Sequence, residues 1–353
     1  MRGAVTKPVE SSTVLGMGYR PWLDGVRALA IGLVVVQHVM GVMPVELGSI
    51  GVGVFFALSG YLITSLLLDE RRLRGAASLS GFYLRRAARL VPALVLVLVV
   101  CDTLFVIAGD HGPLKGSLAA LTYTANYAEI WRGDFVLGFG PTWSLAVEEH
   151  FYVLWPLALR ALVRRFGLRQ ALVSTLVVCV VAVTWRAVLA LLHARWSLIN
   201  IGSVERADAL LYGCAAAIAV RLGWRPRRWV VWAGVATVVV AVFLFDPTRD
   251  TFTGSVIGTA VLAIGGAAAV VGLDYDAPAW LRDVLSLGWI VSIGVWSYGI
   301  YLWHGPLMRA AADFGYSGRY WRVAVVPVAI AAAAVSHRFV ESPIRAWARH
   351  RSA

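Results

Sequence analysis

Residues 26–44, VRALAIGLVVVQHVMGVMP, form the stretch of sequence that decides the fold class. Most of this run is apolar, and a helix of its length, rising 1.5 Å per residue, nearly crosses a hydrocarbon core about 30 Å thick. Over the whole chain 59% of the residues are hydrophobic and 15% are charged, whereas about 25% are charged in an ordinary soluble domain. The sequence therefore predicts an integral membrane protein.

Further apolar runs of similar length follow, separated by short breaks that contain charged residues, glycine or proline. The predicted transmembrane helices cover residues 26–44, 50–68, 90–108, 144–163, 171–192, 206–222, 229–245, 254–272, 286–308 and 322–340. Between the third and fourth, the mixed stretch Gly116–Trp131 is flanked by Asp110 and Asp134, and we expect an interfacial or re-entrant segment there. The predicted fold class is an all-α bundle of about ten transmembrane helices.

Basic residues are concentrated in alternate breaks between these runs. The breaks after the second, fourth and sixth runs carry Arg71, Arg72, Arg74, Arg85, Arg86, Arg89, Arg160, Arg164, Arg165, Arg169, Arg221, Arg225, Arg227 and Arg228. Because cytoplasmic loops carry the excess of arginine and lysine, both termini are expected in the cytoplasm. We expect one transmembrane domain over residues 19–345, between cytoplasmic tails at 1–18 and 346–353.

The remaining global features exclude other classes of function. The formal charge of +12 does not indicate a nucleic-acid partner, because the basic residues lie in membrane-flanking loops, where orientation and anionic lipid account for them. Cys101, Cys179 and Cys214 fall inside predicted helices, which favours small core residues over a disulfide framework or a metal site. The first 25 residues show no pattern of a signal peptide, so the first run is expected to be retained.

Arg27 and His38 are the most prominent polar pair of the first run. They are eleven positions apart, so they share a helix face and stand roughly 16 Å apart. Ionisable residues inside a span are functional candidates. With the amino terminus in the cytoplasm, Arg27 lies near the inner boundary and His38 in the outer half. The alternative is that Arg27 reaches lipid headgroups and His38 makes a structural hydrogen bond.

Glu148, in PTWSLAVEEHFY, is expected at the same depth as His38. Ser144, Glu148 and Tyr152 follow one another at four-residue spacing on one face, whereas Glu149 points about 100° away. A carboxylate at this depth could orient an imidazole or itself take a proton. An interfacial acid that reaches water is the competing interpretation.

Two more clusters are expected at that depth. Ser297, Tyr301 and His304 lie near one face of SYGIYLWHGP, and ERADALLYG places Glu205, Arg206 and Asp208 at the start of the sixth run. Each cluster alone could be a solvated helix end. Together they predict a shared polar cavity, with Arg206, Asp208 and Tyr301 as candidates for the acceptor site.

The cytoplasmic segment FYLRRAARLVP carries Arg85, Arg86 and Arg89 close to one helix face. Guanidinium groups suit phosphate oxygens, and with Arg27 these residues could hold a phosphorylated donor whose reactive end extends to His38. The phosphopantetheine arm of coenzyme A has about that reach. The positive-inside rule alone also accounts for these arginines.

The chain resembles the acyltransferase-3 family of integral membrane O-acyltransferases. The motifs appear in order between Tyr19 and Arg345: YRPWLDGVRALAIGLVVVQH, GVGVFFALSGYLIT, FYLRRAARLVP, PTWSLAVEEHFYVLWP, ERADALLYG, SYGIYLWHGP and HRFVESPIR. The resemblance implies ten spans, an acyl-CoA donor and O-acylation of a sugar, polyketide or other hydroxylated acceptor. It also implies essential roles for Arg27 and His38 and functional roles for Arg85, Arg86, Arg89 and Glu148.

We therefore expect a bacterial inner-membrane O-acyltransferase in which His38 acts as general base or transient acyl carrier and Glu148 or His304 tunes it. Acyl-CoA is the donor substrate, with no tightly bound cofactor and no metal. Ser59 and Tyr61 are donor-channel or packing residues. The arginine-rich composition of a GC-rich genome favours the sugar of a cell-envelope polysaccharide or a macrolide-type natural product as acceptor.

Two other functions fit the same residues. Intramembrane His, Glu and Arg also build the proton relays of coupled transporters and exporters. Such a transporter should show inverted repeats, and the sequence shows no such symmetry. A catalytically silent membrane receptor or scaffold is the third hypothesis. The oligomeric state is left open.

Overall fold

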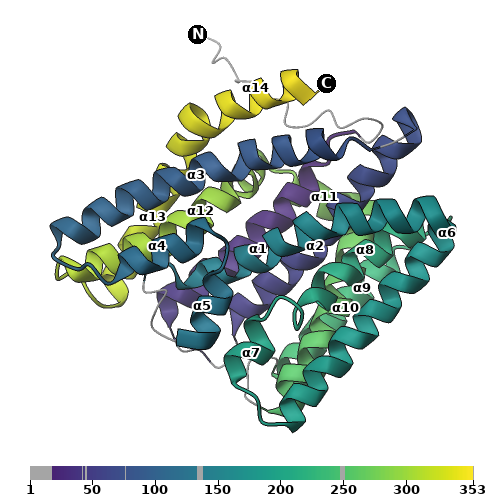
Figure 1. Ribbon diagram of the computed structural model, residues 1–353, viewed down its shortest axis with the longest axis horizontal. Coiled ribbons are helices and arrows are strands. Elements are labelled where there is room, and N and C mark those ends of the chain that lie inside the picture. The colour runs from purple at the N-terminus through teal and green to yellow at the C-terminus, as the bar shows by residue number, and fades with distance from the viewer. Residues whose placement is uncertain are drawn as a thin grey trace.

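The computed structural model describes residues 18–41, 43, 46–75, 77–132, 138–246 and 251–352, so that most of the tail predicted at 1–18 lies outside the described residues. The regular structure of this part of the chain is helical throughout (Figure 1). The α-helices are α1 (Pro21–Met40), α2 (Leu47–Arg74), α3 (Leu79–Ile107), α4 (Pro113–Leu121), α5 (Ala125–Arg132), α6 (Trp143–Leu191), α7 (Trp196–Ile201), α8 (Ala207–Arg221), α9 (Trp229–Val240), α10 (Thr259–Asp276), α11 (Ala279–Leu285), α12 (Gly288–Asp313), α13 (Arg319–Ser336) and α14 (Ser342–Ser352). Short π-helical segments at Ala241–Phe245, Thr253–Gly258 and His337–Glu341 extend α9, precede α10 and join α13 to α14.

Among the described residues, six helical segments are long and apolar enough to cross a membrane, or seven if α11 and α12, bent by 59°, form one span. The membrane bundle is thus confirmed as all-helical, whereas the count of ten stays a prediction. One reason for the lower number is that α6 contains two predicted runs, 144–163 and 171–192. The non-helical φ of 82° and ψ of 177° at Gly167 break it between them. The short α4 and α5 occupy the segment expected to be interfacial or re-entrant.

Helices α1 and α12 pack in parallel at the centre of the bundle. A Cβ added to Gly294 of α12 would lie 1.9 Å from the carbonyl oxygen of Asp24 in α1, so only glycine permits this approach. At the other end of the same helix pair, His38 contacts His304. Helix α2 returns antiparallel beside α1, since Gly48 at its start lies beside Gln37, whereas Gly51 lies beside the backbone carbonyl of Ala30, earlier in α1. These contacts set the register of the helices that carry the predicted site.

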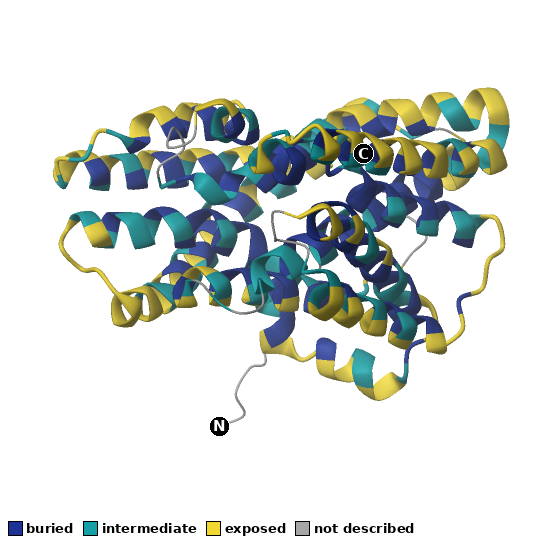
Figure 2. Ribbon diagram, turned by 90° about the horizontal axis from the view of Figure 1, so that it is seen from below, coloured by how far each residue is buried: buried dark blue, intermediate teal, exposed yellow. Residues whose placement is uncertain are grey.

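The other helices surround this centre. Helix α14 packs along α3, while on the other side α8 and α10 pack against α2 and against each other, and α9 packs on α10 (Figure 1). Buried residues concentrate on the inward faces and exposed residues on the outward faces of the helices (Figure 2). Many outward residues are large and apolar, for example Val99, Leu154 and Val180, which are 61%, 66% and 63% exposed. Such a surface suits contact with lipid.

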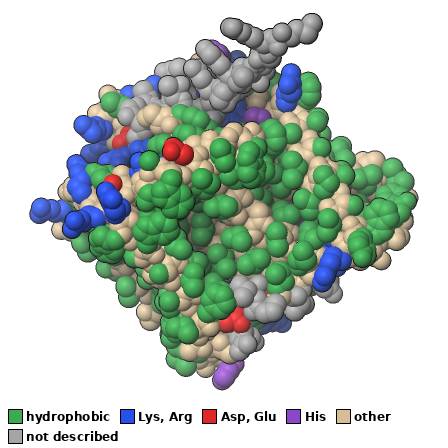
Figure 3. Space-filling model, turned by 180° about the vertical axis from the view of Figure 1, so that it is seen from behind, with side chains coloured by type: hydrophobic (Ala, Val, Ile, Leu, Met, Phe, Trp, Pro, Cys, Tyr) green, Lys and Arg blue, Asp and Glu red, His purple; other side chains and the backbone are tan. Residues whose placement is uncertain are grey.

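Charged side chains are concentrated near the ends of the bundle. In Figure 3 the Lys and Arg side chains gather mainly at one edge of a largely apolar face. We call the end at which α2 finishes, α3 begins and α6 bends the basic end. It includes Arg71, Arg72, Arg74, Arg160, Arg164 and Arg165. The opposite end, where α1 finishes, is called the His38 end.

Candidate active site

His38 and His304 form a hydrogen-bonded pair at the His38 end. Nδ1 of His38 lies 2.9 Å from Nε2 of His304, and Nδ1 of His304 lies 3.1 Å from the carbonyl oxygen of Ile300. A carbonyl oxygen only accepts, so in the neutral pair Nδ1 of His304 donates and its Nε2 accepts from Nδ1 of His38. The hydrogen bonds therefore leave the lone pair of His38 on Nε2.

His38 belongs to the wall of an open cavity of about 510 Å³ at the His38 end. His304 is fully buried behind it, whereas His38 is exposed. Tyr316 and Trp321, whose ring centroids are 4.5 Å apart, lie on the cavity wall with Arg322. A base with a free lone pair thus faces a space large enough for part of a substrate, beside aromatic rings.

Arg309 also lines this cavity, but carboxylates neutralise it. Its Nη2 lies 2.5 Å from Asp110 and its Nε lies 2.9 Å from Asp313. The backbone N–H of Gly112, followed by Arg309, lowers the pKa of the Asp110 carboxyl by hydrogen bonding. This ion-paired network ties the end of α3 to the end of α12 at the cavity rim.

A smaller cavity of about 30 Å³, room for about one water molecule, lies between α1, α2, α6 and α12. The residues with polar groups in its lining are Ser144, Glu148, Ser297, Tyr298 and Tyr301. The Tyr301 hydroxyl lies 2.7 Å from Oγ of Ser144, and its ring centroid lies 5.6 Å from that of His304. The structure thus brings together the predicted polar residues of α1, α6 and α12.

Glu148 is buried and accepts a hydrogen bond of 2.7 Å from Ser59. Its neighbour Glu149 instead pairs with Arg86, which also lies 3.0 Å above the centroid of the Tyr152 ring. The two adjacent acids therefore have different partners, as the 100° rotation between them predicts. The hydrogen-bond partner of His38 is His304, whereas Glu148 accepts from Ser59 and, at 3.5 Å, from the Tyr152 hydroxyl.

The predicted donor-binding arginines divide into two groups. Arg89 has Arg27, Arg86 and Arg345 as charged neighbours, whereas Arg85 faces Glu70, at 3.6 Å. Arg27 and Arg86 are paired with Asp24 and Glu149, whereas Arg89 has no ion pair among the described residues and is the member that an anionic ligand would stabilise most.

Arg345 and His337 are basic residues near this group that the sequence reasoning did not select. Nη1 of Arg345 lies 3.3 Å from Nε2 of His337, and both interact electrostatically with Arg89. The sequence held a signal for both residues, because both belong to the motif HRFVESPIR of the family resemblance. We call Arg27, Arg89, Arg345 and His337 the donor cluster. Asp24 pairs with Arg27, and Glu341 is an acidic neighbour of Arg345 and Arg89.

Three predicted site residues lie elsewhere, since none of them lines either cavity described above. The Tyr61 hydroxyl donates to Asp274 at 2.6 Å and so ties α2 to α10. Arg206 lies 5.9 Å above the centroid of the Phe56 ring. Asp208 forms a two-pronged ion pair with Arg186, with both distances 2.9 Å and both side chains fully buried.

Arg186 is a further residue that sequence reasoning missed. It also donates to the backbone carbonyl of Glu205 at 2.5 Å and so joins α6 to the start of α8. A charged residue in the apolar run 171–192 was the available signal. The Nη1 and Nη2 atoms of Arg186 are both paired, whereas its buried Nε makes no hydrogen bond among the described residues. The two-pronged ion pair indicates a structural role for the predicted acceptor residue Asp208.

Comparisons with known proteins identify the relatives of this chain. The chain is 28% identical to the O-acetyltransferase OatA of Staphylococcus aureus over 93% of its length and 57% of the relative. It is 29% identical to the peptidoglycan O-acetyltransferase OatA of Listeria monocytogenes over 93% of its length and 56% of the relative. The chain thus spans somewhat more than half the length of these curated relatives. No solved structure matches.

The family described as "Acyltransferase domain" matches residues 20–337. This range contains the linings of both cavities and every helix from α1 to α13. Its long apolar helices make the protein a multi-pass membrane protein. The chain belongs to the acyltransferase-3 family.

Proposed function

We propose that this protein is a membrane O-acyltransferase that transfers a short acyl group, such as acetyl, from acyl-CoA to a hydroxyl of a cell-envelope glycan. The observation that carries the proposal is the His38–His304 pair at the wall of the open cavity. It supplies a base whose free nitrogen and orientation are fixed by a buried neighbour.

The donor cluster supports acyl-CoA as the donor. Arg89 has no hydrogen bond or ion pair in the described part of the chain. Its charged neighbours are Arg27, Arg86 and Arg345, and the buried carboxylates of Glu148 and Glu341 also interact with it. Phosphate oxygens would relieve the repulsion between these guanidinium groups. With the basic end in the cytoplasm, the pantetheine arm would extend about 16 Å along α1 toward His38.

The chemistry follows from the tautomer of His38. Nε2 removes the proton of the acceptor hydroxyl while that oxygen attacks the thioester carbonyl, and the carbon–sulfur bond then breaks. The imidazolium returns the proton to the departing thiolate, so an ester and free coenzyme A are formed. His304 accepts the Nδ1–H bond of His38 throughout and stabilises the imidazolium.

The open cavity supports a carbohydrate as the acceptor. Trp321 and Tyr316 offer aromatic faces against which the apolar face of a sugar ring can pack. Peptidoglycan, a glycan, is the substrate in the name of the Listeria monocytogenes relative. We place the acceptor sugar between these rings and His38.

The test uses the full chain in lipid nanodiscs, with acetyl-CoA as donor and soluble peptidoglycan fragments as acceptor. We expect acceptor-dependent release of coenzyme A, detected with a thiol reagent, and an acetyl ester on the glycan, detected by mass spectrometry. His38→Ala should lower turnover by about 10²- to 10⁴-fold, as expected for loss of a general base. His350→Ala, at an exposed site on α14, is the matched control and should retain activity.

Wild-type turnover in His38→Ala would refute the mechanism. Coenzyme A release with a macrolide sugar but not with the glycan would instead assign a natural-product acceptor. Accumulation of acyl-His38 without acceptor would replace direct transfer by a covalent intermediate.

A further inference from the structure

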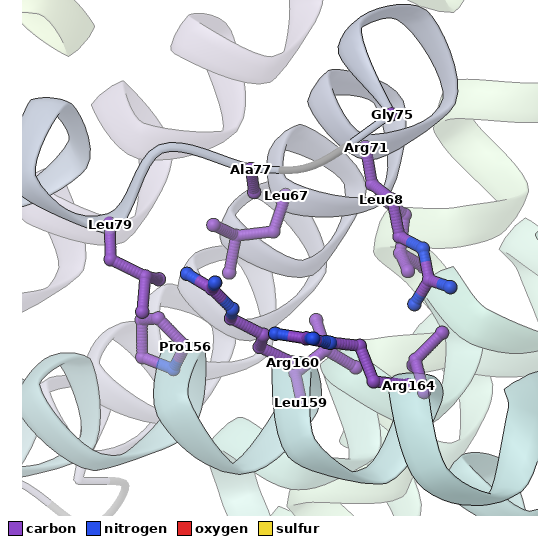
Figure 4. A pocket seen from close by; sticks show the side chains of 11 residues that line it. Leu67, Leu68, Arg71, Gly75, Ala77, Leu79, Pro156, Leu159, Arg160 and Arg164 are labelled. Carbon is purple, nitrogen blue, oxygen red and sulfur yellow. The ribbon is translucent and has the colours of Figure 1, made fainter.

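A cavity of about 400 Å³ lies at the basic end, between the end of α2, the start of α3 and α6 before its bend. Figure 4 shows Arg71 from α2 and Arg160 and Arg164 from α6 around this space. The rest of its lining is aliphatic or glycine: Leu67, Leu68, Gly75, Ala77, Leu79, Pro156, Leu159 and Val163. The cavity therefore combines three positive charges with an apolar wall.

These three guanidinium groups have no acidic partner among the described residues. Nη1 of Arg71 is buried and makes no hydrogen bond there. Arg160 and Arg164 are four positions apart on α6, where like charges repel each other. A buried donor without a partner and two adjacent like charges are both stabilised by an anion with several oxygens.

The apolar wall indicates what carries the anion. No aromatic side chain lines the cavity, so an adenine ring would find no aromatic ring to stack on, whereas the aliphatic wall suits a fatty acyl chain. The next residues of α6 outside the cavity are apolar and outward-facing, since Leu154 and Leu157 are 66% and 49% exposed. A lipid chain in the cavity would thus continue into the bilayer.

We propose that this cavity binds one anionic phospholipid, with its phosphate between Arg71, Arg160 and Arg164 and one acyl chain along the leucines. The site is distinct from the donor cluster, because it shares no residue with it. The bound lipid joins the end of α2 to α6 at the basic end and neutralises their repulsion. The inference does not depend on the proposed function, because it concerns lipid binding alone.

The test measures retention of palmitoyl-oleoyl-phosphatidylglycerol by the full chain, using native mass spectrometry after extraction from vesicles with equal amounts of the phosphatidylcholine analogue. The double substitution Arg160→Gln and Arg164→Gln removes two charges from the cavity. The control, Arg165→Gln and Arg169→Gln, removes two charges from neighbouring α6 positions that do not line it. Size-exclusion chromatography checks that both variants remain folded.

We expect the wild type and the control to retain phosphatidylglycerol in preference to phosphatidylcholine. Each arginine near an anionic headgroup strengthens the binding of that lipid about fivefold. Loss of two arginines should therefore lower the phosphatidylglycerol retained by the cavity variant about 25-fold. Equal loss in both double variants would overturn the proposal, because it would indicate unspecific attraction. Equal retention of the two lipids by the wild type, or displacement of phosphatidylglycerol by free coenzyme A, would also overturn it, the latter by assigning the cavity to the donor.

Discussion

Replacing His304 by glutamine or leucine tests whether a hydrogen bond to its Nε2 sets the reactivity of His38. The amide oxygen of the introduced glutamine would extend to about the position of Nε2 and could accept from Nδ1 of His38, whereas a leucine side chain accepts nothing. His304 is fully buried, and leucine replaces it by a side chain of similar volume. We therefore expect both His304→Gln and His304→Leu to fold.

The expected loss in the leucine variant has a lower and an upper bound. A neutral hydrogen bond contributes about 1 kcal/mol, which changes the population of the reactive tautomer about fivefold. In the serine-protease triad, loss of both the correct tautomer and the orientation of the catalytic histidine lowers kcat about 10⁴-fold. The turnover of His304→Leu should therefore be between about fivefold and about 10⁴-fold below that of the wild type, and His304→Gln should retain about fivefold more turnover than His304→Leu.

The assay is acceptor-dependent release of coenzyme A in nanodiscs, with kcat and KM for acetyl-CoA determined separately. KM for the donor should stay within about twofold, because its phosphates are placed at the opposite end of α1. Thermal unfolding of each variant separates a catalytic defect from a folding defect. Equal losses in the two variants, or wild-type kcat in His304→Leu, would refute the role of this hydrogen bond.

Three other substitutions test the fold and the acceptor site. Arg186→Met should lower the free energy of unfolding by about 3–5 kcal/mol, because it leaves the Asp208 charge buried without a partner; denaturant titration in micelles measures this, and adding Asp208→Leu should restore most of it. Gly294→Ala should lower the free energy of unfolding by about 1–3 kcal/mol, because it forces α12 away from α1, and it should also lower turnover. Gly288→Ala, whose added Cβ has no other atom within 4 Å, should change neither quantity. Trp321→Ala should raise KM for the glycan about fivefold through loss of about 1 kcal/mol of ring contact and leave KM for acetyl-CoA unchanged; an unaltered glycan KM would contradict the assigned acceptor site.

Much of the site could be predicted from helix geometry within single runs of sequence. A span fixes how deep a residue lies, and the 100° step fixes which residues share a face. These rules separated Glu148 from Glu149 and placed His304 on the same face as Tyr301. The positive-inside rule in addition indicated that the basic residues would gather at one end of the bundle.

The division of the arginines could not be predicted in this way. Arg85 and Arg86 are adjacent, yet one faces Glu70 and the other pairs with Glu149. Arg89, of the same motif, is instead close to Arg345, far along the chain. Which acid neutralises which arginine depends on the helix that packs beside it, and the local pattern does not specify that neighbour.

The sequence by itself determined that this protein is a helical membrane protein, which family it resembles and which residues of each helix carry polar chemistry. Apolar length and helical period are local properties, so a single run of residues is enough to specify them. Only the tertiary structure decided that His38 bonds to His304 and that Asp208 is held by Arg186. The physical reason is that these contacts join separate helices, whose register is set by close approaches such as Gly294 against the backbone of Asp24.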